Sequence, residues 1–252
     1  MLYGLYVSAA GAMANSFRQD VVANNLANAD TVAFKRDLAL FTSRPTEAAE
    51  SGQRRYSTAL LEKLGGGTFA LPTHTDHTPA GLERTGKDYD LALQGEGFFQ
   101  VQKGDAILYT RDGRFAVNPS NQLVTATSQL PVLDHDGQPL TVDPAIPYFT
   151  VTETGLISQG ENLIGQLGVV RFDDVKSLRK EGANLFTNNG SETPQPSGAL
   201  IKQKHLERSS VNQTSELVEM IQAHRLFETN LSMLRMQDQS MSQLINQVAG
   251  RS

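Results

Sequence analysis

The sequence predicts an α+β protein. Long helices at the two ends of the chain are predicted to form a coiled-coil-like pair, and the middle of the chain is predicted to form an antiparallel β-domain. The helices are predicted because apolar residues recur at alternating steps of three and four near both termini. The β-domain, an irregular sandwich or barrel, is predicted by a change to period two with frequent turn residues. We expect four parts: an N-terminal helix with an Asn-rich end (1–36), an extended linker or arm (37–80), the β-domain (81–201) and the C-terminal helix (202–252).

The C-terminal helix is predicted over residues 214–248 as one element with a continuous seam. A helix with one apolar stripe must bury that stripe against another surface. Two polar members, His224 and Asp238, interrupt the seam, and we expect them to set the register of the contact. The seam consists of Leu217, Met220, His224, Phe227, Leu231, Leu234, Asp238, Met241, Ile245 and Val248.

The N-terminal helix is predicted over residues 2–28 and is the natural partner of that seam. Several alanines between residues 9 and 14 keep it thin enough for close approach. The alternative is that each helix packs separately on a globular core. Residues 2–14 lack the basic start of a signal peptide, so we expect no cleaved signal. The face toward the partner is expected to contain Tyr6, Ala10, Met13, Phe17, Val21 and Asn24.

Three asparagines, Asn24, Asn25 and Asn28, cluster at the end of this helix. Asparagine is unfavourable inside a helix because its amide competes for nearby backbone groups. One interpretation is a frayed helix end, where asparagine is common. The other is that the amides make fixed hydrogen bonds to a neighbouring helix or subunit. The chemistry of the residues favours neither.

Residues 37–80 are predicted to be extended because glycine and proline are frequent there, with one short helix at 58–64. The β-domain follows as many short strands. Residues 111–114 are predicted to turn a hairpin between two of these strands. The strands are expected at 91–93, 98–102, 107–110, 115–117, 123–125, 131–133, 149–151, 156–158 and 167–171.

The composition excludes several classes of function. A net charge of −5 argues against a nucleic-acid-binding protein and against attraction to an anionic membrane surface. The chain of 252 residues has no cysteine, which excludes disulfides, thiol nucleophiles and cysteine-ligated metals. No segment is apolar enough over a sufficient length to predict a transmembrane helix. The length suits one large domain or two smaller ones.

No group of residues predicts catalysis. The best metal candidate is the run 74–77 (HTDH), which lacks a third ligand. Asp134 and Asp136 begin a β-turn rather than a calcium loop, because the closing glutamate is missing. The glycines at 95 and 97 lack the third glycine of a nucleotide fingerprint, and we expect His224 to be a packed interface residue. The prediction is a protein that is not an enzyme and holds no cofactor or metal.

Several blocks, in order along the chain, resemble the axial proteins of the bacterial flagellum (rod, hook and hook-associated subunits). The N-terminal signature is similar at 23–28 (ANNLAN) and at 34–36 (FKR), with Ala33 where the family commonly has glycine. At the C-terminal end, 206–212 (LERSSVN) is similar, with Ser210 in place of the usual asparagine and Lys204 in place of an upstream glycine. Further similar blocks are 90–101 (DLALQGEGFFQV), 109–115 (YTRDGRF) and 122–125 (QLVT).

This resemblance implies a structural subunit of the flagellar basal-body rod, the axial filament between motor and hook. Among rod proteins, the chain length and single β-domain favour the FlgF and FlgG types, and the short β-domain favours the proximal FlgF type over the distal FlgG type. The implied partners are copies of itself, other rod proteins and hook-side axial proteins, in a periplasmic rod reached by flagellar export. The alternative from another class is a peptidoglycan-acting or carbohydrate-binding β-domain with helical dimerisation ends.

Overall fold

The computed structural model describes residues 2–45, 67–146, 148–190 and 192–249. The chain divides into two compact units, each described here by itself. The helical unit comprises Met1–Ala27, Asp37–His74 and Asn212–Ser252, and the β unit comprises Asn28–Arg36 and Thr75–Val211. The short helix predicted at 58–64 lies outside the described residues, and the division into four parts stays a prediction.

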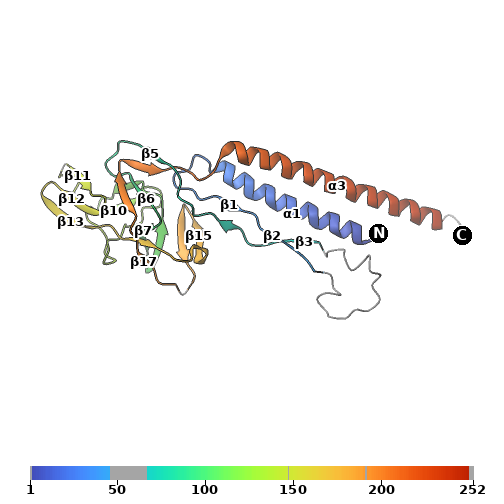
Figure 1. The fold of residues 1–252 in the computed structure, drawn as a ribbon, viewed down its shortest axis with the longest axis horizontal. Helices are drawn as coiled ribbons and strands as arrows, with labels where there is room; N and C mark the ends of the chain where they lie inside the picture. The colour runs from blue at the N-terminus through green and yellow to red at the C-terminus, as the bar shows by residue number, and fades with distance from the viewer. Residues whose placement is uncertain (1, 46–66, 147, 191, 250–252) are drawn as a thin grey trace. The chain divides into compact units, whose positions relative to one another are not determined.

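In the helical unit, α1 (Leu2–Ala27) and α3 (Gln213–Ala249) lie side by side and antiparallel (Figure 1). Asn212 caps α3, because its Oδ1 accepts a hydrogen bond from Ser215 N at 3.1 Å. Glu216 adds a negative charge in the first turn, where the helix dipole favours it. Helices at both ends of the chain are therefore confirmed.

Short strands accompany the helices in the same unit. Strand β1 (Asp37–Leu38) precedes β2 (Phe41–Ser43), which pairs antiparallel with β3 (Thr68–Ala70). Phe17 of α1 meets Phe41 edge to face, with 6.2 Å between ring centroids. Neither α1 nor α3, the two α-helices of the described residues, contains a stretch long and apolar enough to cross a membrane.

The β unit is built from antiparallel strand pairs. Its largest sheet has the order β15-β16-β8-β7-β14-β17, and smaller sheets join β10 to β9, β18 to β6, β19 to β5, and β11 through β12 to β13. The strands are β5 (Leu82–Arg84), β6 (Leu91–Gln94), β7 (Phe98–Lys103), β8 (Ala106–Thr110), β9 (Phe115–Val117), β10 (Leu123–Thr125), β11 (Phe149–Val151), β12 (Leu156–Gln159), β13 (Asn162–Gln166), β14 (Val169–Arg171), β15 (Leu178–Gly182), β16 (Leu185–Asn188), β17 (Gln195–Pro196), β18 (Leu200–Gln203) and β19 (His205–Glu207). In sequence, β4 (His74–Thr75) and the 3-10 helix η1 (Val175–Ser177) complete the described elements.

Two groups of buried apolar side chains form the core of the β unit. The larger group includes Leu91, Phe99, Leu123 and Ile157, all fully buried, and draws on most of the strands between β6 and β18. The smaller group is aromatic, and its Tyr109 and Phe172 rings meet edge to face at 4.8 Å. Buried and more exposed residues alternate in β11 and β12, as a period-two pattern predicts, whereas β6, β8 and β10 each bury three consecutive residues.

The central antiparallel β region is confirmed, whereas the barrel alternative and the hairpin predicted at 111–114 are wrong. The described strands form open sheets with no closed barrel. The turn at 111–114 does not join a hairpin, because β8 pairs with β7 and β16 whereas β9 pairs with β10. Instead, the backbone at Gly113 passes close to the backbone of Leu91 in β6. A Cβ on residue 113 would collide with the carbonyl oxygen of Leu91, so only glycine fits at this position.

Candidate functional site

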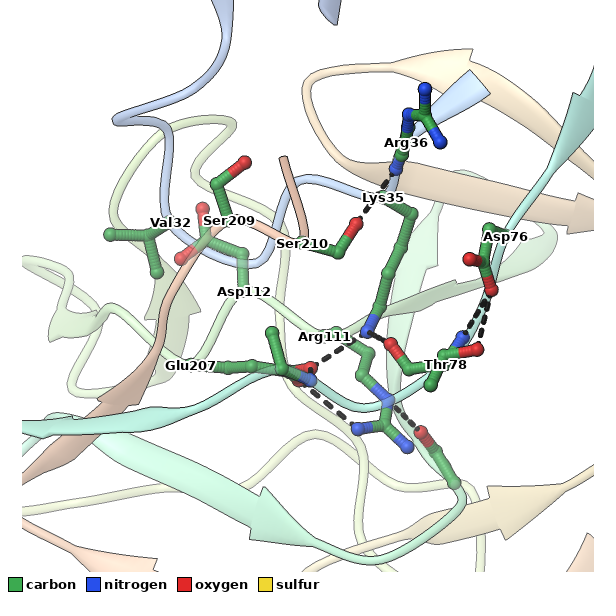
Figure 2. A network of polar contacts seen from close by, with 12 residues as sticks. Val32, Lys35, Arg36, Asp76, Thr78, Arg111, Asp112, Glu207, Ser209 and Ser210 are labelled. Atoms are coloured by element: carbon green, nitrogen blue, oxygen red, sulfur yellow. Dashed lines mark hydrogen bonds and ion pairs between the residues drawn. The ribbon is translucent and has the colours of Figure 1, made fainter. Parts of the chain in front are cut away.

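A buried ion network lies at the centre of the β unit (Figure 2). The carboxylate of Glu207, at the end of β19, is 2.7 Å from Lys35 Nζ through Oε1 and 3.1 Å from Arg111 through Oε2. The side chains are 0% (Lys35), 2% (Arg111) and 1% (Glu207) exposed. Charges this deeply buried are tolerated only when they are paired and hydrogen-bonded.

These three side chains also make hydrogen bonds to backbone groups. Lys35 Nζ donates to the carbonyl oxygen of Thr78 at 2.8 Å, and Ala80 N donates to Oε1 of Glu207 at 2.8 Å. Arg111 donates from Nε to Gly97 O at 2.7 Å and from Nη2 to Gly95 O at 2.6 Å. Burial lowers the pKa of Lys35, although the adjacent Glu207 opposes this shift.

The network connects three blocks that are far apart in sequence. Lys35 belongs to the block at 34–36, Arg111 to 109–115 and Glu207 to 206–212. The first and last blocks also bond through the backbone, since Ala33 N donates to Glu207 O at 2.8 Å. Asn184 Nδ2 donates to Val32 O at 2.8 Å, so residues 28–36 are an integral part of the β unit.

The sequence departs from the family pattern at three positions of this region. Two of them have left-handed backbone, and the third makes a hydrogen bond to the first block. Ala33 and Lys204 stand where glycine is common, and both have left-handed backbone angles, with φ of 55° and 64°. Glycine adopts this left-handed region without strain, whereas alanine and lysine are strained in it. Ser210 stands in place of asparagine, and its Oγ accepts a hydrogen bond from Arg36 N at 2.9 Å.

A second buried polar contact lies within the helical unit. Asn25 of α1 and Glu216 of α3 are each 1% exposed. Asn25 Nδ2 donates to Glu216 Oε2 at 3.2 Å and to Asp37 O at 2.9 Å, and its Oδ1 accepts from Asp37 N at 2.9 Å. For Asn25, the structure therefore shows fixed hydrogen bonds rather than a frayed helix end.

The other predicted residues of the first helix have mixed environments. Ala10 and Val21 are buried, Phe17 is half-buried against Phe41, and Tyr6 and Met13 are exposed. Asn24 is exposed on α1. In the β unit, the half-buried Asn28 accepts hydrogen bonds from Thr31 Oγ1 at its Oδ1 (3.2 Å) and from Ser209 Oγ at its carbonyl (3.1 Å).

The predicted seam of α3 is divided between two environments. Five members are half-buried and four are exposed, so only part of the seam faces α1. The exposed His224 forms a contact with Glu228 on its own helix, Nε2 to Oε1, at 3.4 Å. The half-buried members are Met220, Phe227, Leu231, Leu234 and Met241, and the exposed members are Leu217, His224, Asp238 and Ile245. The side chain of Val248 lies outside the described residues.

Large apolar side chains remain exposed around both helices. Met13 is 69% exposed on α1, and similar exposure recurs along α3 from Leu217 to Ile245. A hollow of about 350 Å³ near the end of the pair is lined by Gly4, Met233, Met236, Gln237 and Ser240. Large apolar side chains exposed repeatedly along a helix are typical of a surface that contacts another protein.

The side chains considered for metal binding have other environments. The His77 ring lies edge-on to Phe98 and Phe186, with 5.6 and 5.0 Å between centroids. Asp134 Oδ1 accepts from the backbone of Asp136 at 2.9 Å and of Gln138 at 2.7 Å, which is a β-turn. No group of three or more His, Asp or Glu side chains suited to a metal ion occurs among the described residues.

Comparison with known proteins gives one consistent family. A model described as flagellar hook protein FlgE/F/G D1 domain matches residues 92–159. A model for the C-terminal part of flagellar basal body rod FlgEFG proteins matches 202–247, and one for flagella basal body rod proteins matches 5–35. These matches include the two helices and much of the β unit.

Full-length relatives agree with the family models. The chain is 36% identical to the flagellar basal-body rod protein FlgF of Caulobacter vibrioides over 233 residues, covering 91% of each chain. It is 33% identical to the rod protein FlgG of Buchnera aphidicola over 262 residues, covering 97% of this chain and 99% of the relative. The rod protein FlgG of Bacillus subtilis is 31% identical over 263 residues, covering 98% and 99%.

The helical ends, the antiparallel β unit and these matches define the class as a structural subunit of a filamentous assembly. The chain belongs to the flagellar basal-body rod protein family. It is a structural rod subunit of the bacterial flagellum, located in the basal body. The sequence resemblance is thereby confirmed.

Proposed function

We propose that the protein is a proximal rod subunit of the FlgF type. The support is its 36% identity to the FlgF protein of Caulobacter vibrioides, together with its short β-domain. The FlgG type is the alternative, because FlgG relatives match at 31–33% identity over nearly the whole chain. Complementation separates the two: the gene should restore rods in a strain lacking FlgF and fail in one lacking FlgG, and the reverse result contradicts the assignment.

In this proposal, α1 and α3 form a coiled-coil-like pair that packs against helices of neighbouring subunits. The observation that carries it is the exposed apolar surface of both helices, which one chain alone leaves in water. Repeated contacts of this heterologous type generate a helical filament when their rotation does not close. The partners are copies of this chain, other rod proteins and hook-side axial proteins.

The residues that carry assembly are those predicted from the two helical faces. Exposed members such as Met13, Leu217 and Ile245 contact neighbouring subunits, and the hollow lined by Met233 and Met236 accepts an apolar side chain from one of them. Half-buried members such as Phe227 and Leu231 serve both the chain's own pair and the assembly. The subunit reaches the periplasmic rod by flagellar export.

The experiment introduces a charge on the exposed apolar surface. Leu217→Asp should abolish incorporation into purified basal bodies and swimming motility, because a carboxylate cannot be buried unpaired at a subunit contact. The isolated protein should keep its circular dichroism and thermal transition, since Leu217 is already half in water. Gln222→Asp, on an exposed polar position of the same helix, is the matched control. Normal rods containing Leu217→Asp would contradict the proposed surface.

A further inference from the structure

The contact between α1 and α3 repeats at seven-residue intervals on both helices. Asn25 of α1 bonds to Glu216 of α3. A Cβ built on Gly11 would lie 3.2 Å from the side-chain amide of Asn230, and one built on Gly4 would lie 3.0 Å from Nε2 of Gln237. Positions 4, 11 and 25 therefore face positions 237, 230 and 216, at multiples of seven along each antiparallel helix.

One further position completes the series on α3. Ala223 falls midway between Glu216 and Asn230 and is 1% exposed. The corresponding position on α1 is Arg18, which is half-buried. The series on α3 is thus Glu216, Ala223, Asn230 and Gln237, each one residue before a position of the predicted seam. At these four positions α3 presents polar or small residues, and half-buried apolar residues such as Phe227 and Leu234 lie between them.

The contacts in these layers depend on which positions of α1 and α3 face each other. The amide of Asn25 is satisfied by Glu216 and by the backbone of Asp37, so a one-heptad shift of α3 that brought Asn230 opposite Gly4 would move Glu216 opposite Arg18 and leave the Asn25 amide without this acceptor. The amide of Asn230 fits because Gly11 has no side chain. The apolar positions repeat at the same interval along both helices, so a one-heptad shift would place apolar residues opposite apolar residues again.

We propose that the layers Asn25–Glu216, Gly11–Asn230 and Gly4–Gln237 specify the register in which α1 pairs with α3. A single polar residue in a helical interface is known to fix register at some expense of stability. Here a polar side chain of α3 meets a glycine of α1 in two layers and an asparagine in a third. His224 and Asp238, the residues expected from the sequence to set the register, are exposed instead. The inference concerns one chain and does not depend on the proposed position in the rod.

The absence of cysteine from the chain allows a direct test by disulfide trapping. The in-register variant carries Gly4→Cys with Gln237→Cys, and the out-of-register variant carries Gly4→Cys with Asn230→Cys. Each is oxidised as a dilute monomer, and intramolecular crosslinks are quantified by peptide mass spectrometry. We expect the in-register crosslink to exceed the out-of-register crosslink severalfold. Equal yields of the two would overturn the proposal.

A second experiment distinguishes an effect on the register of the helices from an effect on the stability of the helical pair. Gly11→Leu is added to both cysteine pairs, with Met13→Leu on the exposed side of α1 as the matched control. We expect Gly11→Leu to lower the in-register yield and raise the out-of-register yield, so that their ratio falls severalfold, while Met13→Leu leaves the ratio unchanged. If Gly11→Leu lowers both yields together and the ratio stays constant, the layers stabilise the pair without specifying its register, and the proposal is wrong.

Discussion

In the β unit, leucine, isoleucine and phenylalanine side chains such as Leu123, Ile157 and Phe99 are withdrawn completely from water. In the helical unit, the buried side chains are alanines, valines and polar residues, such as Ala12, Val22 and Asn25, and the large apolar side chains are half-buried or exposed. Both units also bury a glutamate. Glu207 pairs with two cations, whereas Glu216 accepts a hydrogen bond from a neutral amide.

This difference separates folding from assembly within one chain. A core of fully buried large side chains stabilises a domain without help, because each such side chain contributes roughly 1.5–3 kcal/mol. A helical pair that buries mainly alanine and polar groups gains little from the hydrophobic effect and depends on further partners. The apolar residues needed for those partners are the ones left exposed. One of the three predicted pairs of substitutions compares the two units directly, and the other two pairs lie within the β unit.

The largest effect is expected from Glu207→Gln in the β unit. This change leaves two buried cations, Lys35 and Arg111, without their carboxylate, and removal of one partner from a buried ion pair costs about 3–5 kcal/mol. Urea denaturation should show this loss in the free energy of unfolding. Glu181→Gln is the control, because its pair with Lys103 is exposed and worth less than about 1 kcal/mol. A similar loss in both variants would contradict a stabilising role for the network.

The next effect compares the same substitution in the two units. Leu123→Ala should reduce the free energy of unfolding by about 2–5 kcal/mol, because Leu123 is fully buried in the β core. Leu217→Ala, on the exposed side of α3, should change it by less than about 0.5 kcal/mol. The second variant should instead weaken incorporation into rods. Comparable unfolding losses for the two leucines would remove the distinction between a folding unit and an assembly surface.

The smallest effect is a stabilisation. Ala33→Gly should raise the free energy of unfolding by about 1 kcal/mol, because φ at Ala33 is 55° and glycine adopts this region without strain. Ala92→Gly, in strand β6, should instead lower stability by about 0.5–1 kcal/mol. Thermal melts of both variants provide the measurement. A loss at both positions would mean that the backbone at Ala33 is not strained.

Local patterns predicted most individual elements. Both helices were found near their expected ends, and the strands around Leu91, Leu123 and Ile157 lie where period two placed them. Pairing was harder to predict: the turn at 111–114 has the composition of a hairpin, yet the strands it connects pair with different partners. Turn chemistry is local, whereas strand partners are chosen by the packing of the whole unit.

The ion network of the candidate site could likewise not be predicted from local sequence patterns. Lys35, Arg111 and Glu207 each lie within a block that resembles the family, and charged residues inside such blocks were the available signal. Nothing in the spacing of three residues so far apart in the chain indicates that they share one buried site. Their contact depends on residues 28–36 folding with the β unit rather than with the helix that precedes them in sequence.

The sequence by itself determined the two terminal helices and the period-two β region, because these depend on patterns between near neighbours along the chain. Its resemblance to the flagellar axial proteins indicated the class of protein. Only the tertiary structure decided which charges are buried and which face of α3 meets α1. A repeat of three and four identifies an apolar stripe but not its partner, and two helices can rotate to bring an adjacent stripe into contact. Here close approach at Gly4 and Gly11 and the bond from Asn25 to Glu216 select that adjacent stripe, and the predicted apolar residues are left half-buried or exposed.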